Sequence, residues 1–319
     1  TASRLADYLP WVALVGFGVV LNKDGSFQRT AKFRGPDLDS AVAAELVAVA
    51  GRLNNAFRRL GSGWAIFVEA QRSEAATYPA SRFPDPASAL VDAERKADFE
   101  EKGSHFVSGF FLPSLGLPPA EDAARSESWL YEGRETSSVN PWELVRGFAD
   151  RTDRVLALLD GFMPECRWLD DAGTLTYLHS TISINRHRVR VPETPTYLDA
   201  LLADQPLTGG LEPRLGNQHL RVLTITGFPA TTTPGLLDEM NRLAFPYRWS
   251  TRAILMDKTD ATRLLTKIRR QWFAKRKSIA AILKEVMTNE QSALVDTDAA
   301  NKAADADMAL QELGADMAG

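Results

Sequence analysis

The chain has 319 residues, of which 45% are apolar and 24% are charged. This composition is ordinary for a soluble globular protein and excludes a largely disordered chain. The length favours two lobes with an extension over one small core or three full domains. A net charge of −4 excludes general attraction of the whole protein to polyanions such as nucleic acid.

The cysteine content and the apolar N-terminal run bear on where the protein resides. The single cysteine, Cys166, cannot form an internal disulfide, so a reducing compartment is the simplest expectation. The run LPWVALVGFGVVL at 9–21 contains Pro10 and is too short to cross a bilayer. It has no basic flank and no small-residue cleavage site, so we predict no signal peptide, and any membrane association would go through partners.

The first quarter of the sequence predicts two strands, a helix and a third strand. Residues 15–34 hold two strand-like runs joined by NKDG, in which Gly25 allows the positive φ of a tight turn. Asp37 or Asp39 is expected to cap the helix that follows. The apolar residues of this helix recur at steps of three and four, at Leu38, Val42, Leu46, Val49, Leu53, Phe57 and Leu60. The glycines of GSG at 61–63 end the helix, and WAIFVEAQR forms the next strand.

The middle of the sequence predicts a helix and a strand, then a long loop and a second helix. A Pro-rich stretch precedes a charged helix at about 87–102, after which HFVSGFFLP returns as a strand. Residues 113–139 are rich in Pro, Glu and Ser and predict a loop. The next helix begins at Pro141, a residue suited to the first helical turn. The segment 166–183 predicts a short strand and a turn at 171–173, followed by either a helix or another strand.

A smaller second cycle predicts strands at HLRVLTITGFP (219–229) and YRWSTRAILMD (247–257), with a short helix at 232–245 between them. Everything after this cycle is predicted to be helical. Strands that alternate with helices but are also joined by hairpins favour α+β lobes of the split βαβ, ferredoxin-like kind over a doubly wound parallel sheet. The predicted domains are an N-terminal α+β lobe at 1–192, a second, smaller α+β lobe at 193–260 and a helical connector at 261–319.

The sequence contains none of the common catalytic motifs. A P-loop needs Gly followed by Lys, and no Gly in the chain precedes a Lys. The four histidines are not spaced as metal ligands, and Cys166 has no neighbouring cysteine. We therefore predict no catalytic residue, no metal and no cofactor in this chain, and we expect that it neither binds nor hydrolyses ATP appreciably. An independent enzyme whose site follows an unfamiliar pattern stays an alternative.

The segment RLLTKIRRQWFAKRKSIAAILK at 263–284 carries eight Lys or Arg residues and no acidic residue. In a helix, an apolar stripe that includes Trp272 lies on one face. The basic residues of another face are Arg263, Lys267, Arg270, Lys277 and Lys284. An amphipathic connector with a solvated basic face explains this pattern, and contact with DNA or an acidic partner is the alternative. Residues 285–319, with net charge −7, provide one acidic block.

Several longer stretches carry a specific family resemblance. They are LPWVALVGFGVVLNKDGSFQRTAKFRGPDLDS at 9–40, LNNAFRRLGSGWAIFVEAQR at 53–72, FPYRWSTRAILMDKTDA at 245–261 and IRRQWFAKRKS at 268–278. Together they resemble the TrbE family of conjugal transfer ATPases, which belongs to the wider CagE/TrbE/VirB family of type IV secretion. The likeness spans essentially the whole chain in order.

The resemblance implies the N-terminal assembly or docking region of an ATPase that powers pilus biogenesis and the transfer of DNA or protein. In that family a P-loop domain using ATP and Mg²⁺ follows the matched region, so this segment is expected to be non-catalytic. The implied location is cytoplasmic, peripheral at the inner face of the bacterial inner membrane. The implied partners are inner-membrane and ATPase components of the secretion system and further copies in a hexamer, with DNA as a further candidate. The alternative function is a nucleic-acid-binding module that uses residues 263–284.

Overall fold

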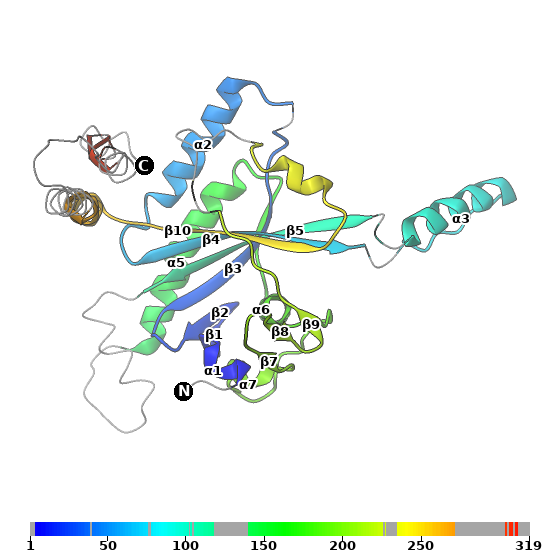
Figure 1. Ribbon diagram of the computed structural model, residues 1–319, viewed down its shortest axis with the longest axis horizontal. Helices are drawn as coiled ribbons and strands as arrows, with labels where there is room; N and C mark the ends of the chain where they lie inside the picture. The colour runs from blue at the N-terminus through cyan, green and yellow to red at the C-terminus, as the bar shows by residue number, and fades with distance from the viewer. Residues whose placement is uncertain are drawn as a thin grey trace, which may run out of the picture. The chain divides into compact units, whose positions relative to one another are not determined.

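The computed structural model describes residues 4–38, 40–75, 78–101, 103, 105–117, 140–225, 227, 235–271, 304, 306–308 and 310–311. The chain groups into two compact units, one of Thr1–Ala56 with Trp64–Ala253 and the other of Phe57–Gly63 with Ile254–Gly319. The main sheet of the first unit and the helices that pack on it show that the fold is α+β, as the sequence predicts (Figure 1). The domain boundaries predicted after residues 192 and 260 stay a prediction.

Two sheets are present among the described residues. The main sheet consists of β1 (Trp11–Gly16), β2 (Val19–Asn22), β3 (Phe27–Arg34), β4 (Trp64–Glu74), β5 (Phe106–Gly116), β6 (Glu165–Trp168) and β10 (Tyr247–Ile254). Its strand order is β1-β2-β3-β5-β4-β10, with β6 paired to β3. The strands β3 and β5 are antiparallel and place Phe27 opposite Gly116 and Phe33 opposite Phe110. The small sheet consists of β7 (Leu207–Thr208), β8 (Arg214–Leu215) and β9 (Gln218–His219).

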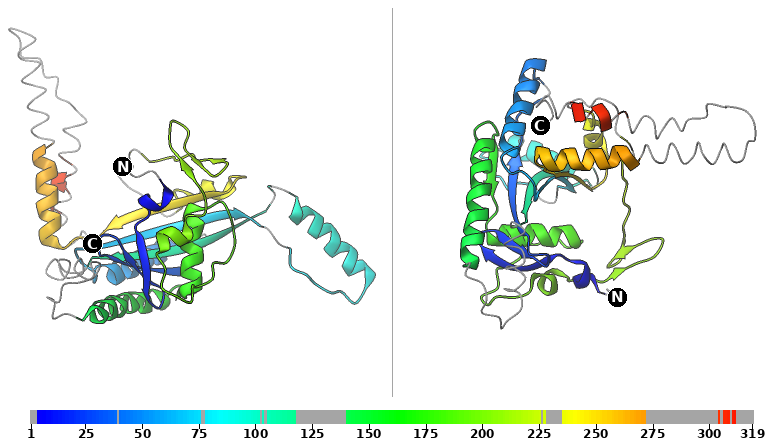
Figure 2. Two further views of the ribbon diagram at one scale, coloured as in Figure 1. Left: turned by 90° about the horizontal axis from the view of Figure 1, so that it is seen from below. Right: turned by 90° about the vertical axis from the view of Figure 1, so that its left-hand side faces the viewer.

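Helices connect and cover these strands (Figure 2). They are α1 (Leu5–Tyr8), α2 (Ala43–Phe57), α3 (Pro86–Glu100), α5 (Pro141–Asp160), α6 (Asp171–Ile182), α7 (Leu198–Leu202) and the 3₁₀ helix η1 (Asp238–Arg242). A further helix occupies residues 258–271 in the second unit. Helix α5 begins as its sequence predicts, with Pro141 in the first turn and the Asn140 side chain accepting a hydrogen bond from the Trp142 amide.

Helices α5 and α6 pack against opposite faces of the main sheet. Phe148 of α5 stacks on Trp64 of β4, with ring centroids 5.3 Å apart. On the other face, the ring of Tyr177 of α6 lies 4.8 Å from that of Phe111. Because side chains alternate along a strand, one set of sheet residues contacts α5 and the other contacts α6. The core on the α6 face consists of Leu5, Leu9, Trp11, Val20, Leu169, Leu175, Tyr177, Leu178, Leu198, Leu202 and Leu215.

The first predicted elements are confirmed with two differences, because the additional strand β1 precedes the two predicted strands and the helix begins later than predicted. Strands β2 and β3 meet at a turn in which Gly25 has φ 79°, as the Asp-Gly pair predicts. Helix α2 begins only at Ala43, after the expected Asp caps, and the Glu45 carboxylate accepts a hydrogen bond from the Val42 amide. Its predicted apolar stripe is half-buried from Leu46 onwards, whereas Leu38 and Val42 are exposed.

Three predictions in the second half of the chain are wrong in detail. The expected turn at 171–173 is the first turn of α6, because the Asp170 carboxylate accepts a hydrogen bond of 2.6 Å from the Gly173 amide and caps the helix. The strand predicted at 219–229 is limited to β9, and residues 220–225 are irregular. The helix predicted at 232–245 appears as η1, in the 3₁₀ form. The last predicted strand forms as β10 and pairs with β4 in the main sheet.

Candidate functional site

The basic face predicted from the sequence lies on the helix at residues 258–271. Arg263, Lys267 and Arg270 are exposed and line the same hollow of about 690 Å³, together with threonine and glutamine side chains. Arg263 also forms an ion pair of 3.1 Å with Asp260, one turn earlier. Leu265 is half-buried, so the two predicted stripes separate on this helix. The predicted residues Lys277, Lys284 and Trp272 lie outside the described residues.

The loop after α2 positions the start of this basic helix. Ser62 accepts a hydrogen bond of 2.8 Å from the Asp257 amide and donates one of 2.6 Å to the Asp260 carboxylate. Gly61 has φ 69°, and a Cβ at this position would lie 2.7 Å from the Asp257 carboxylate oxygen. The GSG sequence therefore fixes the start of the basic helix, whereas α2 ends earlier than predicted, at Phe57.

A second site, which the sequence did not predict, is a cavity of about 600 Å³ in the first unit. One wall is α6, another is the irregular segment 185–188, and the third is the main sheet. The side chains that line it are Lys32, Gln71, Phe111, Leu169, Asp170, Gly173, Thr176, Tyr177, His179, Ser180, Asn185, Arg186, His187 and Arg188. The sequence signal for this site was the run NRHRVR at 185–190, with three arginines at alternate positions.

A polar cluster extends from Tyr177 and Ser180, which line the cavity. The Tyr177 hydroxyl donates to the Glu69 carboxylate at 2.5 Å, and the Arg248 Nε lies 2.5 Å from the other Glu69 oxygen. Arg248 also donates to the Ser180 hydroxyl at 2.9 Å. Burial and then the Glu69 carboxylate raise the pKa of Tyr177 above its usual range, so the phenol stays protonated and donates. Arg248 balances the charge of Glu69, and Tyr177 adds a hydrogen bond from a neutral group.

The Asp204 carboxylate forms a group of hydrogen bonds at the far end of the cavity. It accepts hydrogen bonds from Ser183 at 3.1 Å and Asn185 at 3.0 Å, and the His179 Nε2 lies 3.0 Å away. The His187 ring centroid lies 4.6 Å from that of His179, which the chain spacing of the two histidines did not predict. Within the described residues, no group of three or more His, Cys, Asp or Glu side chains has the arrangement of a metal site.

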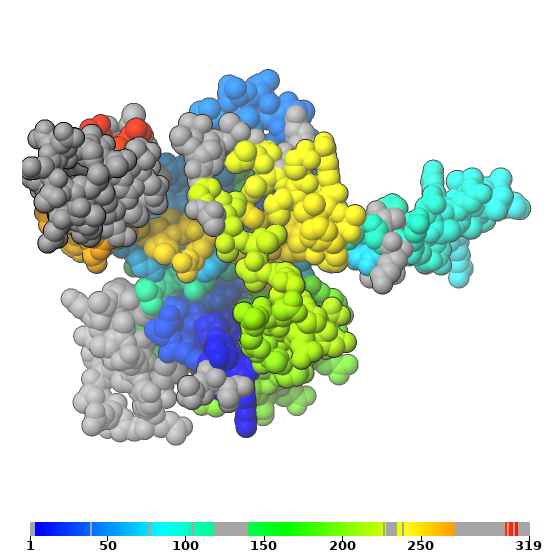
Figure 3. Space-filling model, viewed as in Figure 1, coloured from blue at the N-terminus to red at the C-terminus, as the bar shows by residue number. Residues whose placement is uncertain are grey.

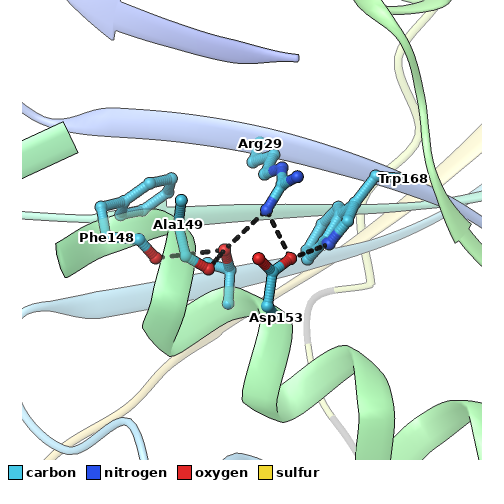
Figure 4. Close-up of polar contacts among 6 residues, drawn as sticks. Arg29, Phe148, Ala149, Asp153 and Trp168 are labelled. Atoms are coloured by element: carbon cyan, nitrogen blue, oxygen red, sulfur yellow. Dashed lines mark hydrogen bonds and ion pairs between the residues drawn. The ribbon is translucent and has the colours of Figure 1, made fainter. Parts of the chain in front are cut away.

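A third polar cluster joins β3, α5 and β6 (Figure 4). The Arg29 guanidinium lies 2.7 Å from the Asp153 carboxylate and 4.3 Å from the centroid of the Trp168 ring. The Trp168 indole donates to the same carboxylate at 2.6 Å, and Arg29 also donates to the Thr152 hydroxyl. Burial lowers the pKa of Arg29, and Asp153 offsets part of that effect. The cluster links three elements around a buried guanidinium, and its contacts are those of a structural element, although Arg29 Nε itself lacks a hydrogen-bond partner among the described residues.

The Cys166 thiol and the Tyr177 hydroxyl of the first unit have raised pKa values and are suited to donating hydrogen bonds. Burial raises the pKa of the Cys166 thiol to about 11, with a further contribution from Asp160. The pKa of Tyr177 also moves upward. A thiol or phenol that stays protonated at neutral pH is a poor nucleophile. These two groups are therefore better suited to packing and hydrogen bonding than to covalent catalysis.

Comparison with known proteins identifies the family. The sequence matches the family described as type IV secretion system ATPase VirB4/TrbE, N-terminal domain, over residues 18–124. It is 32% identical to the conjugal transfer protein TrbE of Rhizobium radiobacter, across 96% of this chain and 39% of that protein. It is 41% identical to the first of two pieces of a probable conjugal transfer protein TrbE of Sinorhizobium fredii (strain NBRC 101917 / NGR234), across 34% of this chain and 74% of that piece. The chain belongs to the VirB4/TrbE family.

The family match confirms the resemblance noted in the sequence. Its residues 18–124 run from the start of β2 to beyond β5, and so include the central strands of the main sheet. The chain spans only 39% of the length of the Rhizobium radiobacter TrbE protein. No helix among the described residues has both the length and the apolar character needed to cross a bilayer.

Proposed function

We propose that this VirB4/TrbE-family chain is a non-catalytic assembly and docking region of a conjugal transfer ATPase. Its support is the 32% identity with a conjugal transfer TrbE protein across 96% of the chain. ATP and Mg²⁺ would be used by a P-loop domain of the longer parent protein, and this region would hold that domain in the secretion assembly. Its location would be the cytoplasmic face of the inner membrane, with other secretion components as partners.

The structural observation that favours docking is helix α3, which extends from the end of the β4–β5 hairpin (Figures 1 and 3). None of its residues is buried, and Leu90 and Val91 are 64% and 48% exposed. Tyr78, in the segment before the helix, donates from its hydroxyl to Asp92 and packs its ring against Phe99. A helix of 15 residues that buries nothing is only marginally stable in water. We propose that a neighbouring subunit of the assembly covers this helix.

The docking proposal is tested in a mating assay. Donor cells with a conjugative system that contains a TrbE-family ATPase express this chain in excess. We expect transfer to fall, because the chain occupies docking sites without supplying a motor. L90E/V91E should remove the inhibition, whereas V47E, a substitution of an exposed valine in α2, should not. Inhibition that survives L90E/V91E would reject α3 as the docking surface, and no inhibition by the unmodified chain would reject the assembly role.

The non-catalytic part of the proposal is tested separately by measuring phosphate release from ATP and Mg²⁺. The purified chain should show no turnover above the protein-free rate, because a P-loop lysine is the main charge partner of the β- and γ-phosphates and the sequence has no Gly-Lys pair. Turnover that a single substitution within this chain abolishes would reject the proposal and revive the enzyme alternative.

DNA binding through the basic helix is the second candidate function, and the shared hollow of Arg263, Lys267 and Arg270 favours it. Phosphate contacts release counterions, so binding should weaken steeply as salt is raised. K267E should weaken binding to single-stranded DNA and reduce the salt slope. R269E makes the same charge change on a residue of this helix that pairs with Asp307 and does not line the hollow, so it should have less effect. Equal effects of both variants would reject a specific face.

A further inference from the structure

The cavity beside α6 has the size and the lining of a ligand site. Its volume of about 600 Å³ falls within the range of small-molecule pockets. Phe111 and Leu169 supply apolar surface, and Gln71, Thr176 and Ser180 supply hydrogen-bonding groups. A pocket with this mixture binds a molecule that has both an apolar part and a polar group.

The charged groups that line the cavity are unbalanced in favour of cations. Lys32, Arg186 and Arg188 all line it, and Asp170 is the one carboxylate among the lining side chains. Asp170 is engaged at the N-terminus of α6, where it accepts a hydrogen bond from the Gly173 amide. The cavity therefore has an excess of positive charge.

The nearby carboxylates do not remove this excess. Glu69 is paired with Arg248 and accepts a hydrogen bond from Tyr177. Asp204, at the far end, is engaged by Ser183, Asn185 and His179. Glu165 lies 4.0 Å from Lys32, at the limit of an ion pair, and both side chains are more than a third exposed. Within the described part of the chain, neither Arg186 nor Arg188 forms an ion pair. An anion bound in the cavity would give Arg186 or Arg188 an ion-pair partner that the described residues do not supply.

Arg186 lines the cavity, and the neighbouring Arg248 repels it. Partial burial lowers the pKa of Arg186, and the neighbouring Arg248 lowers it further. A bound anion would relieve this repulsion. Arginine presents a planar fork of N–H donors that matches phosphate oxygens in pairs, which a lysine does not.

We propose that this cavity binds a phosphate-bearing small molecule, with Arg186, Arg188 and Lys32 contacting the phosphate oxygens. The rest of the ligand lies against Phe111 and Leu169. The phosphate group belongs either to a soluble phosphate ester or to the headgroup of an acidic lipid. This inference goes beyond the proposed docking function and does not depend on it, because it concerns a different surface from α3 and the basic helix.

The first experiment titrates the 319-residue chain with inorganic pyrophosphate in a calorimeter. We expect weak, saturable binding, with Kd on the order of 0.1–1 mM, that weakens as sodium chloride is raised. R186Q/R188Q should weaken binding by about tenfold or more, because charge-assisted hydrogen bonds are lost. The control is R190Q, which neutralises one arginine of the same segment that does not line the cavity. Thermal melting verifies that all variants are folded.

The second experiment measures co-sedimentation with phosphatidylcholine vesicles that contain or lack phosphatidic acid. Pyrophosphate binding that R186Q/R188Q loses supports the site and assigns it to a soluble ligand. Capture by phosphatidic acid alone, also lost in R186Q/R188Q, supports the site and assigns it to a lipid headgroup. Absence of saturable binding in both experiments, binding that R186Q/R188Q retains, or an equal loss in R190Q would overturn the proposal.

Discussion

Arg29 and Arg186 belong to the same unit but have contrasting surroundings. Arg29 lies on β3 beneath α5, is 6% exposed, and contacts Asp153, Thr152 and Trp168 through its guanidinium. Arg186 follows α6 in an irregular segment, is exposed, and lines the cavity without an ion pair within the described part of the chain. The same side chain stabilises the packing of a helix on the sheet at one place and stays available to a ligand at the other.

The contrast follows from the cost of removing a charge from water. A buried guanidinium without a partner is strongly unfavourable, so the site around Arg29 requires an anion and further hydrogen-bond acceptors. Arg186 keeps contact with water and needs no permanent partner. An arginine that is available to a ligand is therefore better identified by its lack of an ion-pair partner than by its residue type.

The largest expected effect comes from removing the aromatic wall beside the Arg29 cluster. Phe148 is buried, and its ring stacks on Trp64 and lies 5.5 Å from that of Phe27. Phe148→Ala should lower the free energy of unfolding by about 3–5 kcal/mol, because it creates a cavity in the core. Urea denaturation followed by fluorescence measures this change. Trp142→Ala, at an exposed position of the same helix, should change it little, and a similar loss in both variants would contradict the assigned packing of α5.

A smaller effect is expected from removing the anion that Arg29 requires. Asp153→Ala leaves the buried guanidinium with Thr152 and Trp168 only, and should lower the free energy of unfolding by about 1–3 kcal/mol. We expect a loss toward the lower end of this range, because the Asp153 side chain is 53% exposed and water can replace part of the interaction. Asp150→Ala removes an exposed carboxylate from the same helix and is the control. If the two variants unfold at the same urea concentration, the ion pair contributes nothing to stability.

The sequence predicts the elements around Arg29 well because their signals are local. The Asp-Gly pair marks the turn at which β3 begins after β2. Pro141 and Asn140 mark the start of α5. The sequence leaves the α6 region open because an Asp pair before Gly173 is typical of turns and of helix caps alike, and the choice depends on packing against the sheet.

The cavity and the segments after α6 are harder to predict because their structure depends on residues far apart in the chain. Residues 220–225 have strand-forming side chains but are irregular, and β propensity requires a neighbouring strand to take effect. The pairing of β10 with β4 joins segments far apart in the chain. The cavity likewise gathers Lys32, Phe111 and Arg186 from three separate elements. No spacing rule connects such residues, whereas the basic helix is recognisable because its residues share one helical face.

The Asp204 cluster offers a pH-dependent comparison with the Arg29 cluster. Burial by itself raises the pKa of Asp204, but hydrogen bonds from Asn185, His179 and Ser183 outweigh it and lower the pKa below the ordinary Asp value. A lowered folded-state pKa means that this carboxylate contributes stability above the unfolded value, about 3.9, and loses it as the pH falls through the folded value. The melting temperature of Asp204→Asn should lie below that of the unmodified chain at pH 6, and the gap should close below about pH 4. A gap that stays constant to pH 3 would show that geometry, not charge, explains the loss.

The smallest expected effect on the free energy of unfolding comes from replacing Arg186, the second arginine of this comparison. R186Q/R188Q removes two exposed charges that form no ion pair within the described part of the chain, so the free energy of unfolding should change by no more than about 0.5 kcal/mol. The size of this change in the free energy of unfolding should depend on salt. Without added salt, loss of the repulsion between Arg186 and Arg248 should make the variant slightly more stable, and sodium chloride should reduce the difference by screening that repulsion. Urea denaturation at low and high salt measures both quantities. A loss above about 1 kcal/mol, independent of salt, would place Arg186 with Arg29 as a structural residue, because only a charge that the fold already uses is costly to remove.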